Sequence, residues 1–564
     1  MDTADGVVAG AEHAVTVALS LLLFVVLLML AAASACGRGL RTATAAAATG
    51  AARTAAPDGP AAYPVIGTLY VMDGHRDNPF RRFTELARRY GPVYAMTMGS
   101  TPCVIVNDYP SIKEVLITNG SKFGGRPDFS RYNALFAGDR NNCEDNEEEE
   151  YNEDTEEAAE VSEEPVSLAL CDWSWLQETR RKIARMYCSP KVCSSNYGLL
   201  DSIASDELDV FLESLAAVTD RGAEREVQVK QPLLMACANM FVRFMCSTQF
   251  EYGDPEFQTM VRTFDEIFWD INQGYAVDFL PWLRPFYAGH MRKLCSWSAH
   301  IRRYMMDKVV SRRSSYATAV AAAMDGGGYD DNDDDEQEPA DFTDALLMSL
   351  RKDPRLNMDH VLFELEDFIG GHSAVGNMVM LALSMVATRP HVARAIRDEA
   401  ERVTGGQRLV RLYDKPDMPY TEATLFETLR VVSSPIVPHV ATEDTTIKGF
   451  KIPKGTCVIL NNYEINTSPA YWNDPEVFDP NRFIHRKSGE KPCIRKPEYF
   501  LPFSTGKRTC IGQQLVSGFG FVLLAGVLQR YEVKATAQMA IPEARLALPP
   551  DTYPLILKPL DGSP

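Results

Sequence analysis

One cysteine lies in a glycine-rich loop whose residue types suit a thiolate metal ligand. The loop reads Phe503-Ser-Thr-Gly506-Lys-Arg508-Thr-Cys510-Ile-Gly512. Gly506 allows a tight backbone turn, and Gly512 allows the close approach of a flat group. Arg508 can pair with a carboxylate, and Phe503 can pack beneath the loop and shield the sulfur. An apolar helix is predicted from about residue 513 to 529, and its N-terminal partial positive charge favours a thiolate at Cys510.

The loop resembles the haem-binding loop of the cytochrome P450 family, Phe-x-x-Gly-x-Arg-x-Cys-x-Gly, and matches each of its fixed positions. The resemblance implies a P450 fold, mainly α with a minor β-sheet. It implies haem b, with Cys510 as the axial ligand of the iron and with Phe503, Gly506, Arg508 and Gly512 beside it. A thiolate ligand donates electron density that favours O–O cleavage. Electrons are then expected from NADPH through a flavoprotein reductase.

A second motif gains meaning from the first. Glu427 and Arg430 are spaced to pair on one face of a helix, and Asp479-Pro-Asn-Arg482-Phe lies between them and Cys510. The resemblance implies that Glu427, Arg430 and Arg482 form one network beneath the haem. We expect this network to hold the haem-loop region in place.

Further haem contacts are implied only by the resemblance. His439 stands five residues before Asp444, where many family members have a propionate-binding histidine; a simple loop histidine is the alternative. Trp175, with Arg180 beside Arg181, matches the helix that contacts the other propionate. The spacing is one residue longer than usual, and Trp173 competes for the role.

The expected distal helix departs from the family pattern, [Ala/Gly]-Gly-x-[Asp/Glu]-Thr. Here the stretch reads Gly370-Gly371-His372-Ser373-Ala374-Val375. The interval to Arg389-Pro390 fixes the register, so Ser373 replaces the acid and Ala374 replaces the threonine. A substrate hydroxyl or a water can complete the proton relay, or His372 or Ser373 can substitute in it. Otherwise the enzyme does not activate dioxygen in the ordinary way. Gly371, His372, Ser373 and Ala374 are the candidate catalytic residues.

The same run also resembles one branch of the family, the Spook/Spookier-type enzymes of arthropod ecdysteroid hormone synthesis. The stretch from Cys171 to Arg181 is similar to that branch as well. The resemblance implies a sterol substrate and an early step, between 7-dehydrocholesterol and the ketodiol. An apolar pocket suits such a flat substrate. The candidate lining residues are Phe136, Ala374, Val375, Ile436 and Val437.

The N-terminus predicts a membrane anchor. From Ala14 to Ser34, 21 residues carry no charge, which is enough helix to cross a hydrocarbon core of roughly 30 Å. Acids precede the segment and arginines follow it, so the positive-inside bias places the rest of the chain in the cytosol. We expect a lumenal N-terminus (1–13), a single-pass anchor (14–36) in the endoplasmic reticulum membrane, a linker (37–60) and a catalytic domain (61–564). A cleaved signal peptide and a mitochondrial transit peptide are weaker alternatives.

The net charge of −19 is concentrated in two acidic runs. Residues 144–164 hold 13 acids, and residues 325–338 hold 8. Without them the net charge is about +2, and such runs are typical of disordered, solvated insertions, which we expect at about 139–165 and 322–341. We expect no nucleic-acid partner. The 12 scattered cysteines indicate reduced thiols.

The hydrophobic pattern predicts one domain with a hairpin at 93–98 and 102–107, mainly helices from about 170 to 430, and then short strands before the last helix. Basic residues near the thiolate face could dock an acidic electron-donor flavoprotein, although ordinary surface charge is the alternative. These residues are Arg181, Lys182, Arg185, Lys496 and Lys507.

Three functions are compatible with the sequence. The first is a monooxygenase that acts on a sterol and receives electrons from a reductase. The second is a haem-thiolate isomerase or dehydratase that needs no external electrons, which Ser373 and Ala374 favour. The third is a non-catalytic haem or sterol binding protein or a gas sensor, which the intact cysteine loop argues against.

Overall fold

The computed structural model describes residues 55–75, 78–136, 167–219, 223–313, 316 and 338–560. The expected anchor, most of the linker, the first acidic insertion and residues 322–337 of the second lie outside this part of the chain. Asp341, at the expected end of the second insertion, belongs to the folded body. Its carboxylate caps a helix and lies 2.7 Å from the Arg313 guanidinium.

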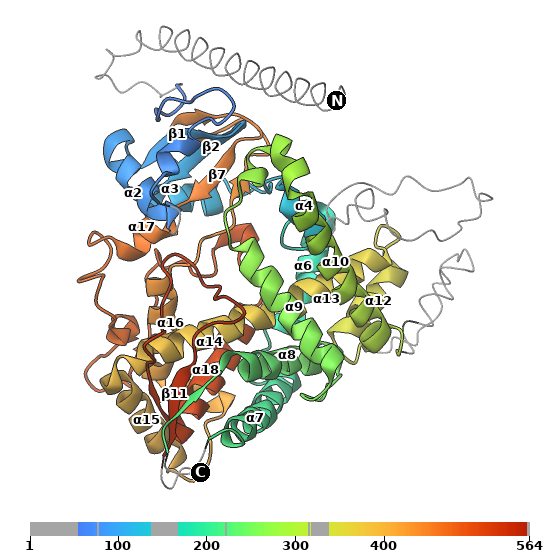
Figure 1. Ribbon diagram of the computed structural model, residues 1–564, viewed down its shortest axis with the longest axis vertical. Coiled ribbons are helices and arrows are strands. Elements are labelled where there is room, and N and C mark those ends of the chain that lie inside the picture. The colour runs from blue at the N-terminus through green and yellow to red at the C-terminus, as the bar shows by residue number, and fades with distance from the viewer. Residues whose placement is uncertain are drawn as a thin grey trace, which may run out of the picture.

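The described chain is mainly helical, as predicted (Figure 1). The α-helices are α2 (Pro79–Tyr90), α3 (Tyr109–Lys113), α4 (Ser130–Phe136), α6 (Trp175–Cys188), α7 (Ser195–Ala216), α8 (Lys230–Cys246), α9 (Pro255–Ile271), α10 (Ala288–Met305), α12 (Phe342–Lys352), α13 (Met358–Ile369), α14 (Gly371–Ala387), α15 (Pro390–Thr404), α16 (Pro419–Val432), α17 (Asn462–Thr467) and α18 (Gln513–Arg530). The predicted helix after Cys510 is therefore confirmed as α18.

Four small sheets accompany the helices. The strands are β1 (Val93–Met98), β2 (Thr101–Val106), β3 (Arg225–Val227), β4 (His439–Val440), β5 (Thr445–Ile447), β6 (Phe450–Ile452), β7 (Cys457–Leu460), β8 (Ile484–His485), β9 (Cys493–Ile494), β10 (Tyr531–Lys534) and β11 (Leu555–Pro559). The largest sheet has the order β1-β2-β7-β4, and its first pair is the predicted hairpin. His439 lies in β4, opposite Val458, and is therefore a strand residue rather than a loop residue.

The main core is a helical bundle in which α14 is the central helix. It packs against α8 and α18, and α18 also packs against α7 (Figure 1). Small residues allow this close approach: a Cβ atom on Gly520 would collide with the Met378 side chain, and one on Gly526 would lie 2.5 Å from Leu208. The segment 358–387 is apolar and long enough to cross a membrane, but 83% of its apolar window is buried. It is therefore the core of the domain.

A buried ionic network connects α16 to the segment before the cysteine loop. Arg430 donates to both carboxylate oxygens of Glu427 at 2.7 Å and to the Asn466 carbonyl at 2.8 Å. Arg482 approaches the same carboxylate at 3.3 Å, and the Asp479 backbone N–H donates to it at 2.9 Å. The sequence-predicted residues Glu427, Arg430 and Arg482 thus meet in space.

Removing Arg430 should destabilise the fold strongly. In Arg430→Leu, the Glu427 carboxylate loses its main partner while it stays buried, so we expect the free energy of unfolding to fall by about 3–5 kcal/mol. Arg482→Leu is the matched comparison, because its side chain is more exposed and makes the longer contact. Thermal unfolding should show the smaller loss for Arg482→Leu; equal losses would contradict this account of the network.

Candidate active site

The cysteine loop is held by its own backbone and opens onto free space. The Cys510 N–H donates to the Phe503 carbonyl at 2.9 Å. Gly506 has a φ of 73°, and a Cβ atom there would collide with the Leu116 carbonyl, so both its conformation and its packing require glycine. A Cβ atom on Gly512 would meet nothing within 4 Å. The loop thus leaves room for a flat group next to Gly512.

Cys510 keeps exposed surface beside its loop and lies just before α18. Desolvation by the surrounding protein atoms raises the pKa of its thiol, while the backbone N–H groups of Gly512 and Gln513 and the charge of Arg181 lower that pKa. Binding of a metal ion requires the deprotonated sulfur. These N–H groups and this cation all stabilise the thiolate.

Three guanidinium groups meet beside the loop without a carboxylate partner. Arg508 donates to the carbonyls of Gly124 and Cys171, and Arg126 donates to the carbonyls of Ala169 and Pro438. Arg181 donates to the Thr509 carbonyl. Within the described residues, none of the three guanidinium groups makes an ion pair with an acid, although the Asp172 carboxylate accepts from the Arg126 backbone N–H at 2.7 Å and therefore lies nearby. We call Arg126, Arg181 and Arg508 the cation cluster.

The repulsion within the cation cluster is visible in its pKa values. Burial, followed by the charges of Arg508 and Arg181, lowers the pKa of Arg126 to about 9. Burial, followed by the charge of Arg508, lowers the pKa of Arg181 to about 10. Like charges repel one another at this range, and an anion among them would lower their energy. The cluster is therefore a candidate anion site.

Three buried nitrogen atoms at this place lack a hydrogen-bond partner among the described residues: Arg181 Nε, Arg508 Nη1 and His439 Nε2. A buried polar atom without a hydrogen-bond partner lowers the stability of a folded protein. The His439 Nδ1 lies 2.8 Å from the Phe123 carbonyl, and burial lowers the pKa of His439 to about 3. A bound anion would raise that pKa and would allow both ring nitrogens to donate. The group that fits carries a metal for Cys510 and carboxylates for the cation cluster.

One face of the central helix is open. From 361 to 387, only Asp367, Gly370, Gly371 and Ala374 are more than slightly exposed, and their spacing places them on one helical face. We call these four residues the open strip. Side chains of other elements cover the remaining faces of this segment. The exposed surface of this segment is therefore centred on Ala374, because Cβ atoms on Gly370 and Gly371 would lie 3.2 Å from the rings of Phe264 and Phe241.

The polar side chains next to the open strip, His372 and Ser373, are buried in the core. Neither residue has exposed surface. The His372 ring packs edge-on against Phe264 of α9, and its Nδ1 lies 2.6 Å from the Ile369 carbonyl. Burial lowers the pKa of His372 to about 4, so the ring is neutral at physiological pH. The structure places neither side chain on the open strip.

Comparison with known proteins decides the family. The family model named Cytochrome P450 matches residues 57–143 and 175–557. The chain belongs to the cytochrome P450 family. The gap between the matched stretches contains the acidic run at 144–164. Membership of the family implies haem iron as the cofactor and an external supply of electrons.

Several curated P450 proteins are similar along most of the chain. Cytochrome P450 307a1 of Drosophila melanogaster is 43% identical, over 90% of this chain and 89% of that protein. Cytochrome P450 1B1 of Mus musculus is 27% identical, over 85% and 82%. Steroid 17-alpha-hydroxylase/17,20 lyase of Ictalurus punctatus is 26% identical, over 89% and 91%.

Trp175 and Arg180, two expected haem contacts of this P450, contact residues other than those of the cysteine loop. Trp175 is 57% exposed, and the Arg355 guanidinium lies 3.8 Å from the centre of its ring. Trp173 instead lies 5.5 Å from the Arg508 guanidinium. Arg180 points to Glu364 of α13 at 2.8 Å. Successive residues of a helix point about 100° apart, so Arg181 faces the cysteine loop and Arg180 does not.

The expected pocket residues are not brought together on one surface. Val375 is fully buried in the main core, and Ala374 is the neighbour that reaches the open strip. Ile436 is 9% exposed and belongs to a second core cluster, while Val437 is 37% exposed. Phe136 is half-buried at the edge of the main core. Only Ala374 of the five is placed on the open strip.

The basic residues divide into two groups. Lys182, Arg185, Lys496 and Lys507 are exposed, as a docking surface requires. Arg181 is buried and belongs to the cation cluster instead. Arg126 was missed, because its place depends on the long-range pairing of Gly125 with Val440, which brings it next to His439. The run Gly124-Gly125-Arg126-Pro127 was the available signal.

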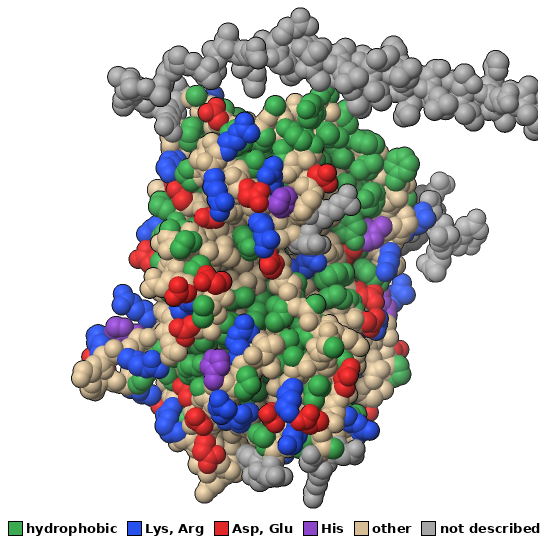
Figure 2. Space-filling view, turned by 60° about the vertical axis from the view of Figure 1, so that its left-hand side comes forward, with side chains coloured by type: hydrophobic (Ala, Val, Ile, Leu, Met, Phe, Trp, Pro, Cys, Tyr) green, Lys and Arg blue, Asp and Glu red, His purple; other side chains and the backbone are tan. Residues whose placement is uncertain are grey.

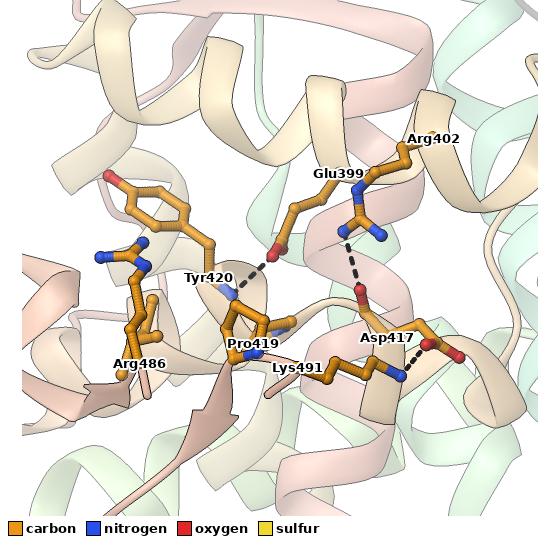
Figure 3. Close-up of a pocket in the computed structure, with 9 residues that line it drawn as sticks. Glu399, Arg402, Asp417, Pro419, Tyr420, Arg486 and Lys491 are labelled. Carbon is orange, nitrogen blue, oxygen red and sulfur yellow. Dashed lines mark hydrogen bonds and ion pairs between the residues drawn. The ribbon is translucent and has the colours of Figure 1, made fainter. Parts of the chain in front are cut away.

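A separate surface pocket of about 310 Å³ lies between α15, the start of α16 and the β8–β9 hairpin (Figure 3). Charged groups in this pocket already have partners. Glu399 accepts from the Tyr420 N–H at 2.9 Å, Arg402 donates to the Asp417 carbonyl at 2.9 Å, and Lys491 pairs with the Asp417 carboxylate. Because these partners are satisfied, the cysteine loop is the better candidate site.

The cation cluster predicts opposite effects in the empty and the haem-loaded protein. In Arg126→Gln, repulsion with Arg181 and Arg508 falls, so the haem-free protein should be as stable as the wild type or more stable. The loaded protein should lose haem at least several-fold faster, because one charge partner of the carboxylates is absent. Thermal unfolding and haem transfer to apomyoglobin measure the two effects. Exposed Arg185→Gln is the control, and unchanged haem loss in Arg126→Gln would contradict the anion site.

The open strip predicts contrasting effects for two adjacent residues. Ala374→Leu adds bulk to the open face, so it should block ligand binding with little effect on stability. Val375→Ala leaves a cavity in a closed core and should lower the free energy of unfolding by about 2 kcal/mol. Thermal unfolding and azole-binding spectra distinguish the two. If Ala374→Leu were the more destabilising change, the open strip would be misplaced.

Proposed function

We propose that the protein is a haem-thiolate monooxygenase that oxidises a sterol at an early step of ecdysteroid hormone synthesis. The observation that carries the proposal is the exposed Cys510 thiol beside the cation cluster, where Arg181 Nε and Arg508 Nη1 have no hydrogen-bond partner among the described residues. Support for a sterol comes from the resemblance of residues 370–375 to the ecdysteroid branch. A relative named steroid 17-alpha-hydroxylase/17,20 lyase also supports it.

Separate residues would hold the haem and contact the substrate. The haem, when bound, supplies iron that activates dioxygen with electrons from NADPH and a reductase. The Cys510 sulfur would bind its iron, and Arg126, Arg181, Arg508 and His439 would hold its carboxylates. The partly exposed Ala374, near the rings of Phe264 and Phe241, would contact a rigid, lipophilic substrate.

Proton delivery differs from the family pattern. Ala374 places no hydroxyl on the open strip, and Ser373 is turned into the core. Of the four strip residues only Asp367 is titratable, and burial raises its pKa to about 6. Its carboxylate accepts from the Leu168 N–H at 2.7 Å, so it is already engaged with that segment. A water or a substrate hydroxyl beside Ala374 therefore has to carry the proton.

The same feature favours a second candidate, a haem-thiolate isomerase or dehydratase. Such chemistry on an already oxygenated sterol needs no external electrons and no proton relay from a threonine. Ala374 on the open strip is the specific observation in its favour.

We also propose that the protein is anchored in the endoplasmic reticulum membrane with its catalytic domain in the cytosol. Exposed Tyr63 and Val65 lie near the end of the expected linker, and exposed Trp282 and Phe286 lie in the turn Pro281–Tyr287. Figure 2 shows hydrophobic side chains gathered at the end of the molecule that carries the β1–β2 sheet. The exposed Lys182, Arg185, Lys496 and Lys507 support docking of an acidic reductase.

Turnover of sterols by the purified, haem-loaded protein tests the proposal. 7-Dehydrocholesterol and its oxygenated derivatives would be incubated with and without NADPH and reductase. Product that forms only with electrons is the expected result. Product formed from an oxygenated sterol without electrons would move the assignment to isomerase chemistry, and no conversion of any sterol would overturn both.

A further inference from the structure

A buried polar network joins α8, α9 and α14 to a C-terminal segment. Its members are Lys230 of α8, Asp265 of α9 and Asn377 of α14, each with at most 2% of its surface exposed. Lys230 Nζ donates to Asp265 Oδ2 at 2.6 Å and to the carbonyls of Leu548 and Pro549 at 3.0 Å each. All three protons of this ammonium group are therefore used.

Asn377 is the central member of this network. Its Nδ2 donates to Asp265 Oδ1 at 3.0 Å and to the Ser373 carbonyl at 2.8 Å, and its Oδ1 accepts from the Leu548 N–H at 2.8 Å. One amide therefore fixes α9, its own helix and residue 548 relative to one another. No hydrocarbon side chain of similar size could replace these three bonds.

The network lies next to the open strip. Ser373, whose carbonyl Asn377 binds, directly precedes Ala374. On the other side, α9 touches the strip itself, because a Cβ atom on Gly370 would lie 3.2 Å from the Phe264 ring. A shift of α9 along α14 would therefore change the space beside Gly370 and Ala374. In Figure 1, α8 and α9 lie beside α14.

Stability alone does not explain a buried ion pair at this place. Replacing such a pair by apolar residues of similar volume is often neutral or stabilising, whereas a satisfied polar network specifies one geometry. Here the specified geometry is that of the segments around the open strip.

We propose that Asn377 is a positioning residue that, through the Lys230–Asp265 pair, sets the shape of the distal pocket and thereby the selection of bulky ligands. The inference rests on the proposed function only for the identity of the substrate. The effect of Asn377 on the shape of the distal pocket applies to any bulky ligand of that pocket.

The test compares Asn377→Leu with Tyr553→Phe in the full-length, haem-loaded enzyme. Tyr553 makes a hydrogen bond of 2.9 Å with Ser384, which joins the same helix to the same C-terminal region farther from Ala374. Three probes are titrated by their optical spectra: imidazole, the bulky azole econazole, and 7-dehydrocholesterol. We expect Asn377→Leu to weaken econazole and sterol binding on the order of tenfold, with imidazole unchanged. Tyr553→Phe should leave all three affinities unchanged.

Wild-type affinity for econazole in folded Asn377→Leu would overturn the inference, and so would an equal loss in Tyr553→Phe. If Asn377→Leu does not load haem, the double variant Lys230→Met/Asp265→Leu replaces it, because it removes both charges together. The double variant should also bind econazole more weakly and imidazole unchanged. If it bound both as the wild type does, the inference would equally be overturned. A wild type that binds econazole but no sterol would refute the proposed substrate and leave the positioning role intact.

Discussion

The cation cluster is the constraint on which the site depends. Arg126, Arg181 and Arg508 come from three separate segments, and each is held by backbone carbonyls rather than by acids. We propose that this arrangement raises the energy of the haem-free protein and lowers that of the loaded one. Haem binding would then be coupled to the packing of α6, the loop at 124–126 and the cysteine loop.

The rest of the fold keeps these segments in register. Glu427 and Arg430 connect α16 to the region before the cysteine loop, where Arg482 completes the network. The bundle of α7, α8, α14 and α18 sets the distance between the cysteine loop and the distal helix. Buried polar groups thus lie in two places: the Glu427–Arg430–Arg482 network and the contact of α8 and α9 with α14. The open strip is apolar apart from Asp367.

Much of this was readable from local patterns. The loop around Cys510, the Glu427–Arg430 spacing, the hairpin and α18 depend on neighbours in sequence, so they were predicted. Residues that depend on helical phase or long-range pairing were not. The sequence pattern favours Trp175 and Arg180 with Trp173 as a competitor, whereas Trp173 and Arg181 lie beside the cysteine loop, because a step of one or two residues turns a side chain to another face. Arg126 and Asn377 gain their roles only when distant strands and helices meet.

The central claim is that the Cys510 thiolate holds the haem iron, and the reduced carbon monoxide complex tests it most directly. The wild type should show the long-wavelength Soret band typical of thiolate-ligated haem. Cys510→Ser should lose that band, while Cys188→Ser, which changes a buried thiol of α6, should keep it. A Cys510→Ser variant that retains the thiolate spectrum would contradict the account.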